Sequence, residues 1–514
     1  MDHDSSFKNF NRTDWWLLGL FVLLKILIHL LTDTHGAYGY FRDELYYLDC
    51  ARHLDWGYVD QPPLSILILA VTRALFGTSL LAIRLPVMLI GAATVVLTGL
   101  LAGEMGGGRF ARCLACLAVL TAPIFLAMGS FFSMNAFDQF FWVSAGYVLV
   151  RLIKTENPRL WLWFGLIAGL GLENKTSIGF FGVSLVAAMA ATPLRRHFRF
   201  WQFWAGGSIA ALLLLPHLLW QIHHDWPTLE FMRNASLYKN MPTTLLSFFT
   251  GQLLMIGPLN TPVWLAGLLS LFLARDGRRY AVFGIVYLLL FVTFHLTNGK
   301  VYYLSPAYPL LLAPGAVWLE KALARRRWAQ AAAVGLLAVG GMAVAPLAIP
   351  VLAPEPFLRY QDALGMRAPQ QERAHSGALP QHLGDRLGWE EFVALVADAY
   401  ARLEPADRAK CAVLVSNYGE AGAINQLGAR YGLPRAISGY MNYYLWGPGD
   451  ATGEVLLAYW PRKEDLVPLF DRVDEVARFH HPYVMARQND RPLFLCRGLK
   501  IPLAEAWKLI KTYY

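Results

Sequence analysis

A short segment near the N-terminus holds the residues best suited to chemistry. It runs Tyr40-Phe-Arg-Asp-Glu-Leu-Tyr-Tyr47 and is followed by Gly57-Tyr-Val-Asp-Gln-Pro-Pro-Leu64. Its carboxylates Asp43, Glu44 and Asp60 can each accept a proton from an attacking hydroxyl group, as a general base does. We predict these three as the catalytic residues, with Asp43 or Asp60 as the base.

Cations that can bind a phosphate group occur in other short polar segments. Lys175 and Lys300 lie between apolar runs, where topology does not require a lysine. Charged hydrogen bonds from lysine or arginine to phosphate are among the strongest that proteins make. We predict Lys175 and Lys300 as phosphate ligands, with Arg233 and Arg52 as further candidates. The side chains predicted to contact the substrate are Gln61, Tyr46, Tyr47, Trp226, Tyr302 and Tyr303.

Metal and nucleotide signatures are weak in this sequence. His223 and His224 are adjacent, so their side chains diverge on a helix, and no third ligand has a suitable spacing. No glycine-rich phosphate loop follows a predicted strand. We predict no certain cofactor, leave a divalent metal open, and favour a lipid-linked substrate over a nucleotide sugar.

The elements that must position these residues are mostly apolar helices. Of the 514 residues, 56% are hydrophobic and 16% charged, whereas a soluble protein carries about a quarter charged residues. The chain is therefore predicted to be a polytopic α-helical membrane protein. About eleven spans are predicted, at 14–32, 81–102, 112–129, 135–152, 160–172, 177–192, 200–219, 249–273, 280–296, 302–319 and 328–350.

Basic residues are distributed unevenly along the chain. Residues 354–514 hold 19 basic and 19 acidic residues, so the net charge of +9 comes entirely from residues 1–353. With a cytoplasmic N-terminus, the inner segments collect 17 basic residues and the outer segments eight, which follows the positive-inside rule. This pattern indicates membrane orientation and not nucleic-acid binding. It places the candidate residues and the C-terminal region on the outer face.

Two domains are predicted from composition. Residues 1–353 form a membrane domain, whose first outer loop, 33–80, contains two amphipathic helices on the membrane surface. One begins near Tyr47 and the other covers residues 64–76. Residues 354–514 are predicted to form a soluble α/β domain.

The C-terminal domain is expected to shape access for the substrate, not to supply catalytic groups. Asn417–Glu420 and Gly439–Trp446 combine aromatic residues with Asn or Glu, which suits sugar or headgroup contact and equally suits a domain core. Cys411 and Cys496 are expected to form a disulfide or to remain as two buried thiols. The predicted strands are 412–415, 455–459 and 493–496, and the predicted helices are 390–403 and 420–430.

These motifs resemble the protein O-mannosyltransferase-like superfamily of GT-C glycosyltransferases, which includes glycosyltransferase families 39 and 83. The most specific are Phe41-Arg-Asp-Glu-Leu-Tyr-Tyr47 with Asp60-Gln-Pro-Pro-Leu64, and Asn298-Gly-Lys-Val-Tyr-Tyr-Leu-Ser-Pro-Ala-Tyr-Pro309. Gly169–Ser177 and His217–Phe231 also match, so the resemblance covers the membrane part of the chain. That branch includes the bacterial aminoarabinose and galacturonic acid transferases that modify lipid A.

The resemblance implies an inverting transfer of a sugar from a polyprenyl-phosphate donor to a lipid, glycan or protein acceptor. It implies that Asp43 is the essential aspartate of the first outer loop, and that Lys175 and Lys300 are lysines of the family pattern. Aminoarabinose transferases carry Glu-Lys where this chain has Asp60-Gln61. One phosphate-binding cation is thus absent, which disfavours an aminoarabinose donor. The implied location is the bacterial inner membrane, with the active site and C-terminal domain in the periplasm.

A polar-lipid transporter or flippase is the alternative, because it would use the same charged cavity without chemistry. Such proteins often show internal repeats with broken helices in matching halves. No such repeat is evident here, and a transporter has no need of a large outer domain. The predicted partners are a polyprenyl-phosphate sugar, a lipid or glycan acceptor and membrane lipids, with no nucleic acid.

Overall fold

The computed structural model describes residues 11–366 and 377–514. Two compact units are formed from interleaved parts of the chain. The first contains the chain up to Gly36 together with Arg84–Trp220 and Pro242–Val351, and the second contains Ala37–Ile83, Gln221–Met241 and Leu352–Tyr514.

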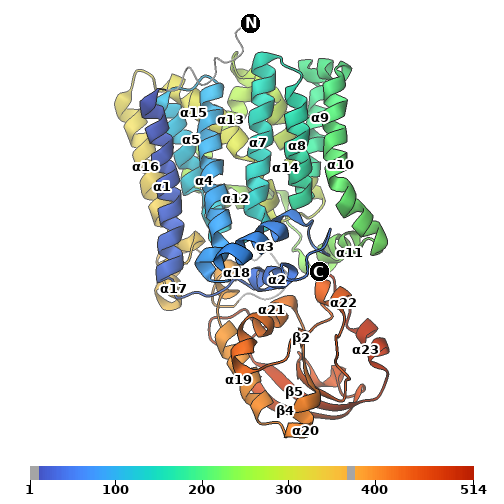
Figure 1. Cartoon of the computed structure of the whole chain (residues 1–514). Helices are drawn as coiled ribbons and strands as arrows, with labels where there is room; N and C mark the ends of the chain where they lie inside the picture. Colours follow the sequence, from blue (N-terminus) through green and yellow to red (C-terminus); the bar gives the residue numbers. More distant parts are fainter. Residues whose placement is uncertain (1–10, 367–376) are drawn as a thin grey trace. The chain divides into compact units, whose positions relative to one another are not determined.

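The first unit is a bundle of apolar helices (Figure 1). Among the described residues, six helical segments are long and apolar enough to cross a membrane, or up to eight if each of two bent pairs is one span. The long helices are α1 (Arg12–His35), α4 (Leu80–Glu104), α7 (Met134–Thr155), α10 (Trp201–His223), α14 (Ala281–Leu296) and α16 (Arg327–Ala348). The shorter ones are α5 (Arg109–Thr121), α6 (Pro123–Met128), α8 (Leu160–Asn174), α9 (Ser177–Ala190), α12 (Leu245–Ile256), α13 (Thr261–Leu273) and α15 (Pro309–Ala322).

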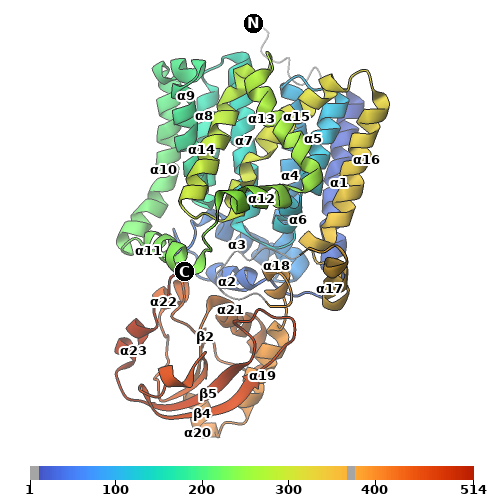
Figure 2. The same ribbon diagram turned by 180° about the vertical axis from the view of Figure 1, so that it is seen from behind.

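The prediction of a multi-pass helical membrane protein is confirmed, but three predicted spans are not single helices. One of them, 302–319, divides into the short helix Val301–Ala307 and α15. The region 249–273 forms α12 and α13, which meet at 93°, and α12 lies across the direction of the long helices (Figure 2). Gly257 stands at this break with a φ of 94°, which favours glycine, and Pro258 follows it. The region 112–129 divides into α5 and α6 at Pro123, because proline cannot donate the hydrogen bond that would continue the helix.

The C-terminal part of the second unit is built on a five-stranded sheet in the order β2-β1-β3-β5-β4. The strands β1 (Cys411–Val415) and β3 (Val455–Tyr459) are parallel and buried at every residue, as their unbroken apolar sequences predict. β5 (Arg491–Leu499) runs antiparallel to β3 and to β4 (Phe470–Phe479), and β2 (Ala436–Ile437) completes the sheet. The α/β prediction is confirmed. β4 was not predicted, because charged residues interrupt its apolar pattern.

Helices cover this sheet and extend from it. α19 (Trp389–Ala401) and α21 (Tyr418–Leu427) confirm the two predicted helices within a few residues. The remaining helices are α17 (Pro354–Ala363), α18 (Gln381–Gly384), α20 (Pro405–Lys410), α22 (Asn442–Trp446) and α23 (Leu503–Leu509).

Two earlier segments of the chain pack with this domain in the second unit. They hold α2 (Arg42–Cys50), α3 (Leu64–Phe76) and α11 (Pro227–Asn234). α3 matches the predicted amphipathic helix at 64–76, with Leu67 and Leu75 exposed and Ile66 and Leu69 buried. α2 has no exposed apolar face, because all but one of its residues are buried, largely against α21, and its location at a membrane surface stays a prediction.

Of the two expectations for Cys411 and Cys496, the structure confirms two buried free thiols and not a disulfide. Cys411 pairs with Val455 of β3, and Cys496 pairs with Leu456 of the same strand from its other side. The two cysteines are therefore two strand spacings apart, each about 4.8 Å, whereas the Cα atoms of a disulfide lie within about 7 Å. Both thiols are free and buried.

Candidate active site

Asp43 is the second residue of α2, where the helix dipole favours a negative charge. Its Oδ1 accepts a hydrogen bond from the Tyr418 hydroxyl at 2.8 Å and lies 3.6 Å from Nε of Arg42. The Asp43 side chain is 28% exposed. Within the described parts of the chain, no hydrogen bond or ion pair reaches its second oxygen, Oδ2. Asp43 is therefore held at one oxygen, and its other oxygen is available to a ligand.

Glu44 has a different environment from its neighbour. Its side chain is fully buried, and Oε2 accepts a hydrogen bond from the backbone N–H of Phe41 at 2.8 Å. This contact satisfies a donor at the start of α2, where helices have unpaired N–H groups. It gives Glu44 a role in fixing the end of the helix that carries Asp43.

Asp60 lies near Asp43, and tyrosines of α2 contact or face both carboxylates. The Tyr46 hydroxyl is 3.0 Å from Oδ1 of Asp60 and 2.9 Å from Oδ1 of Asn442. The pKa of Asp60 is raised to about 6, mainly by burial and also by the negative charge of Asp43, while the Tyr46 hydrogen bond and the positive charge of Lys239 act in the opposite direction. The structure thus brings the predicted residues Asp43, Asp60 and Tyr46 into one cluster.

The raised pKa of Asp60 predicts a pH-dependent cost to folding. An aspartate carboxyl in the unfolded chain has its ordinary pKa of 3.8, and the folded one has a pKa of about 6, so the folded state favours the protonated form. The stabilising contribution of that form is complete below about pH 4 and is lost as the pH rises through about 6. Asp60→Asn is therefore expected to raise the thermal unfolding temperature at pH 7.5 and to change it little at pH 4. If the unfolding temperatures of Asp60→Asn and the wild type differed more at pH 4 than at pH 7.5, the raised pKa of Asp60 would be contradicted.

Tyr47 completes the carboxylate cluster from the same helix. Burial, together with the charges of Asp43 and Asp60, raises the pKa of Tyr47 well above 10, so it is a neutral phenol. The Gln61 side chain is also buried; its Oε1 is 3.5 Å from the Ser65 hydroxyl, and its amide nitrogen has no partner among the described residues. A buried amide nitrogen of this kind is suited to donate to a ligand.

Arg52 is occupied by other residues. Its guanidinium donates to Asp49 at 2.7 Å and to Gln426 at 2.7 Å. Asp49 also accepts from Asn425 and from Tyr443, each at 2.6 Å. These contacts make Arg52 part of a buried polar network between α2 and the C-terminal domain.

The segment 221–241 supplies further candidates to the second unit. Arg233 on α11 is exposed, as is Trp226 at the start of that helix. Thr228 connects the segment to the first loop, since its hydroxyl is 3.4 Å from the carbonyl of Tyr58. Lys239, which was not among the predicted site residues, lies near enough to Asp60 to lower its pKa.

A second cluster lies in the first unit and is built around Lys175. The Lys175 ammonium donates to Oδ1 of Asn135 at 2.7 Å and lies 3.7 Å from Oδ2 of Asp138. Asp138 is buried in α7 and accepts from Ser177 at 2.7 Å and from Trp142 at 3.0 Å. The carboxylate thus fixes the lysine at the junction between α8 and α9.

The predicted aromatic pair is part of this second cluster. The Lys175 ammonium lies 5.2 Å from the ring centroid of Tyr303 and 5.7 Å from that of Tyr302, within the range of a cation–π interaction. Lys300 precedes these tyrosines at the cap of a short helix, Val301–Ala307. The structure therefore brings Lys175 to the segment that carries Lys300, as a shared phosphate site would require.

Two site contacts were not predicted from the sequence. Tyr418 and Asn442 lie in segments that were assigned either to a surface or to a core, and both prove to be buried against α2. Sequence offers no signal for these pairings, because each joins residues more than 350 positions apart.

Comparisons with known proteins agree with the resemblance predicted from the motifs. Residues 60–220 match the family of dolichyl-phosphate-mannose-protein mannosyltransferases. Lipid A galacturonosyltransferase RgtD of Rhizobium johnstonii is 24% identical over 55% of this chain and 61% of RgtD. Undecaprenyl phosphate-alpha-4-amino-4-deoxy-L-arabinose arabinosyl transferase 1 of Pseudomonas fluorescens is 26% identical over 44% of this chain and 42% of that protein. The chain therefore spans less than two thirds of the length of each of these curated relatives.

The fold matches a solved membrane protein over most of its length. ArnT from Cupriavidus metallidurans covers 94% of this chain, which covers 98% of ArnT, with a TM-score of 0.58 for the apo form and 0.60 for the form bound to undecaprenyl phosphate. Sequence identity is 16% and 17%. The fold class is thus that of polytopic membrane proteins with a C-terminal α/β domain. The sequence of the chain is similar to the mannosyltransferase family over residues 60–220 and to RgtD and the Pseudomonas fluorescens transferase over about half of the chain.

Proposed function

We propose that this protein is an integral-membrane glycosyltransferase that moves a sugar from a polyprenyl phosphate to a lipid, glycan or protein acceptor. The observation that carries the proposal is the environment of Asp43. Its carboxylate is partly exposed, lies at a helix N-terminus, and has one oxygen held by Tyr418 while the other accepts no hydrogen bond from the described residues. That arrangement suits a base that takes a proton from a bound hydroxyl.

The reaction is a single displacement at the anomeric carbon. The acceptor oxygen forms a bond to that carbon while its proton passes to Oδ2 of Asp43. The bond between the anomeric carbon and the phosphate oxygen breaks, and polyprenyl phosphate leaves with the electron pair. One displacement inverts the configuration at the sugar. Asp60 is a neighbouring carboxylate, whose raised pKa allows it to share a proton with Tyr46 near neutral pH.

The leaving phosphate requires cations, which we assign to Lys175 and Lys300 with Arg233 as a further ligand. Lys175 is fixed by Asn135 and by the buried Asp138, so it is oriented before a ligand binds. A cation that is already oriented stabilises the negative charge that develops on the leaving phosphate in the transition state. The ArnT relative solved with undecaprenyl phosphate supports a donor of this lipid class.

The relatives suggest candidate substrates. RgtD supports lipid A as acceptor and galacturonic acid as the sugar, and the Pseudomonas fluorescens relative supports an amino-arabinose donor. Gln61 stands where the aminoarabinose transferases carry lysine, so we favour the first. We further propose that the short helices also cross the bilayer, which gives about eleven spans. The active site and C-terminal domain would then face the periplasm.

Mass spectrometry of envelope lipids and glycans, with and without this protein, tests the proposal. Loss of one sugar from lipid A or another envelope glycan on deletion is the expected result. Complementation by the wild-type protein should restore it, and complementation by Asp43→Asn should not. Restoration by both forms would favour a transporter, which moves a lipid without a catalytic base.

A further inference from the structure

The helix that carries Asp43 is clamped by a helix of the C-terminal domain. α21 lies along α2, and two of its glycines allow the close approach. A Cβ atom on Gly422 would lie 2.6 Å from the backbone carbon of Leu45, and one on Gly419 would lie 2.2 Å from Cγ of Arg42. Both contacts are shorter than carbon atoms tolerate. The two helices are therefore fitted to each other at the end where Asp43 lies.

Tyr418 begins α21 and reaches Asp43 directly. Its side chain is buried, and its hydroxyl donates to Oδ1 of Asp43 at 2.8 Å. The ring lies beneath the Arg42 guanidinium, 4.8 Å away, and beside the ring of Tyr46, 5.2 Å away. Burial raises the pKa of Tyr418 well above 10, so the phenol keeps its proton for this hydrogen bond.

The start of α21 is itself rigidly held. Oδ1 of Asn417 accepts from the backbone N–H groups of Gly419 and Glu420 at 2.9 and 3.1 Å. The Glu420 carboxylate accepts in return from the N–H groups of Ser416 and Asn417 at 3.0 and 3.2 Å, forming a capping box. Arg491 lies 3.2 Å from Glu420.

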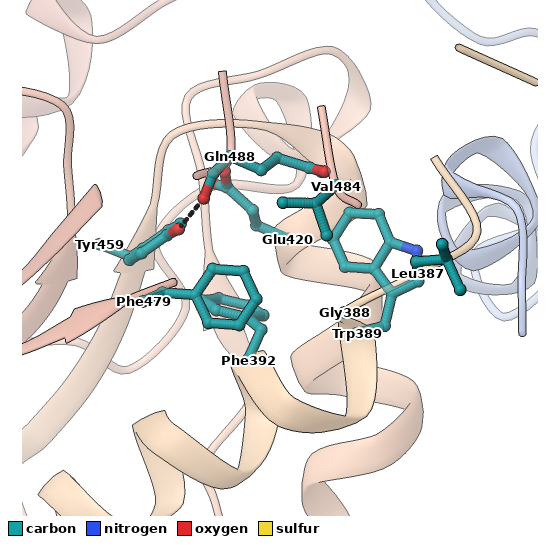
Figure 3. Close-up of a pocket in the computed structure, with 9 residues that line it drawn as sticks. All are labelled: Leu387, Gly388, Trp389, Phe392, Glu420, Tyr459, Phe479, Val484 and Gln488. Carbon is teal, nitrogen blue, oxygen red and sulfur yellow. Dashed lines mark hydrogen bonds between the residues drawn. The ribbon is translucent and has the colours of Figure 1, made fainter. Parts of the chain in front are cut away.

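The outer side of this cap is packed by aromatic residues. Glu420 lies at a small pocket lined by Trp389, Phe392, Tyr459 and Phe479 (Figure 3). The Tyr459 hydroxyl donates to the carbonyl of Gln488 at 2.7 Å, which closes one side of the pocket. The cap of α21 is thus embedded in the core of the C-terminal domain. Because Tyr418 is the first residue of this helix, its backbone is held in place by the same contacts.

We propose that Tyr418 is a positioning residue for the Asp43 base. This inference rests on the proposed function, in which Asp43 accepts the proton of the acceptor. The phenol occupies Oδ1, fixes the rotation of the carboxylate, and leaves Oδ2 for the acceptor hydroxyl. The C-terminal domain then takes part in the chemical step, beyond the access role expected from the sequence.

Tyr418→Phe tests the proposal, because it removes one hydroxyl and keeps the ring. Loss of a hydrogen bond that orients a charged group is expected to lower kcat by about tenfold to a hundredfold with little change in KM for the donor. Tyr443→Phe is the matched control. It removes a buried tyrosine hydroxyl that donates to Asp49 on the same helix at 2.6 Å, so it should lower the unfolding temperature similarly and leave kcat within about twofold to threefold.

Two further variants, 4-aminophenylalanine at position 418 and Asp43→Asn, show whether a failed test rules out the role of Tyr418 or the proposed function itself. 4-Aminophenylalanine at position 418 keeps an N–H donor and is expected to restore most of kcat. If Tyr418→Phe turns over at the wild-type rate while Asp43→Asn is inactive, the positioning role is wrong and the base stands. Equal losses in Tyr418→Phe and Tyr443→Phe would also overturn the role, because they would show a general disturbance of α2. An active Asp43→Asn would overturn the proposed function itself.

Discussion

Replacing Asp43 by asparagine is expected to lower the rate of sugar transfer by about two to four orders of magnitude. Asparagine has the same size, and its Oδ1 can still accept the hydrogen bond that Tyr418 donates to Asp43 at 2.8 Å. The variant should therefore fold and insert, but its amide cannot take a proton from the acceptor. Single-turnover measurements on purified protein check the result.

Donor binding supplies the control for this variant. The cations assigned to the phosphate are unchanged in Asp43→Asn, so the affinity for the donor should remain within a few-fold of the wild type. Transfer at a near-normal rate would show that Asp43 is not the base. Loss of donor binding together with transfer would show that the aspartate acts in binding and not in the chemical step.

Lys175→Met is expected to lower kcat/KM for the donor by roughly tenfold to a hundredfold. The reason is the loss of one charged hydrogen bond to phosphate, which contributes about 1.5–3 kcal/mol. Methionine keeps the apolar stem of the side chain beside Tyr303. Steady-state kinetics at varied donor concentration measure the effect.

Asp138 offers a way to separate binding from stability. Without Lys175, the buried carboxylate loses the cation that lies 3.7 Å away, so Lys175→Met alone should also destabilise the protein. Adding Asp138→Asn removes that buried charge and is expected to recover unfolding temperature but not kcat/KM. Recovery of both would mean that Lys175 serves only as the counterion of Asp138.

Lys154→Met is the matched control for the lysine. Lys154 lies near the other end of α7 and pairs with the buried Glu104 at 2.8 Å. Its replacement removes a comparable ion pair from the same helix, so stability should fall while kcat/KM for the donor stays close to the wild-type value.

The helices and most strands could be predicted because their signal is local. Apolar length predicted every region that forms the bundle, and unbroken apolar runs predicted β1 and β3. The bend at Gly257 was missed, since both sides of it are apolar and the hydropathy continues through the break. β4 was missed because a strand with one exposed face carries charges that resemble those of a loop.

The part of the candidate site that could be predicted also has a local signal in the sequence. Asp43, Asp60 and Lys175 lie in short motifs whose residue types are informative by themselves. The contacts that orient them come from distant parts of the chain, such as Tyr418 for Asp43 and Asn135 for Lys175. Arg52 shows the reverse case, because its type suggested a phosphate ligand whereas Asp49 and Gln426 occupy its guanidinium. Only the folded structure shows which charges are already paired.

Following both products of the reaction with purified protein decides whether the protein transfers a sugar with Asp43 as the base. The wild-type protein would be incubated with a radiolabelled polyprenyl-phosphate sugar and lipid A, in detergent and in proteoliposomes. We expect label to appear on the acceptor and one polyprenyl phosphate to be released for each sugar transferred, and we expect Asp43→Asn to do neither. Movement of intact donor across the proteoliposome bilayer, with no release of polyprenyl phosphate from any donor of the proposed class, would contradict this expectation.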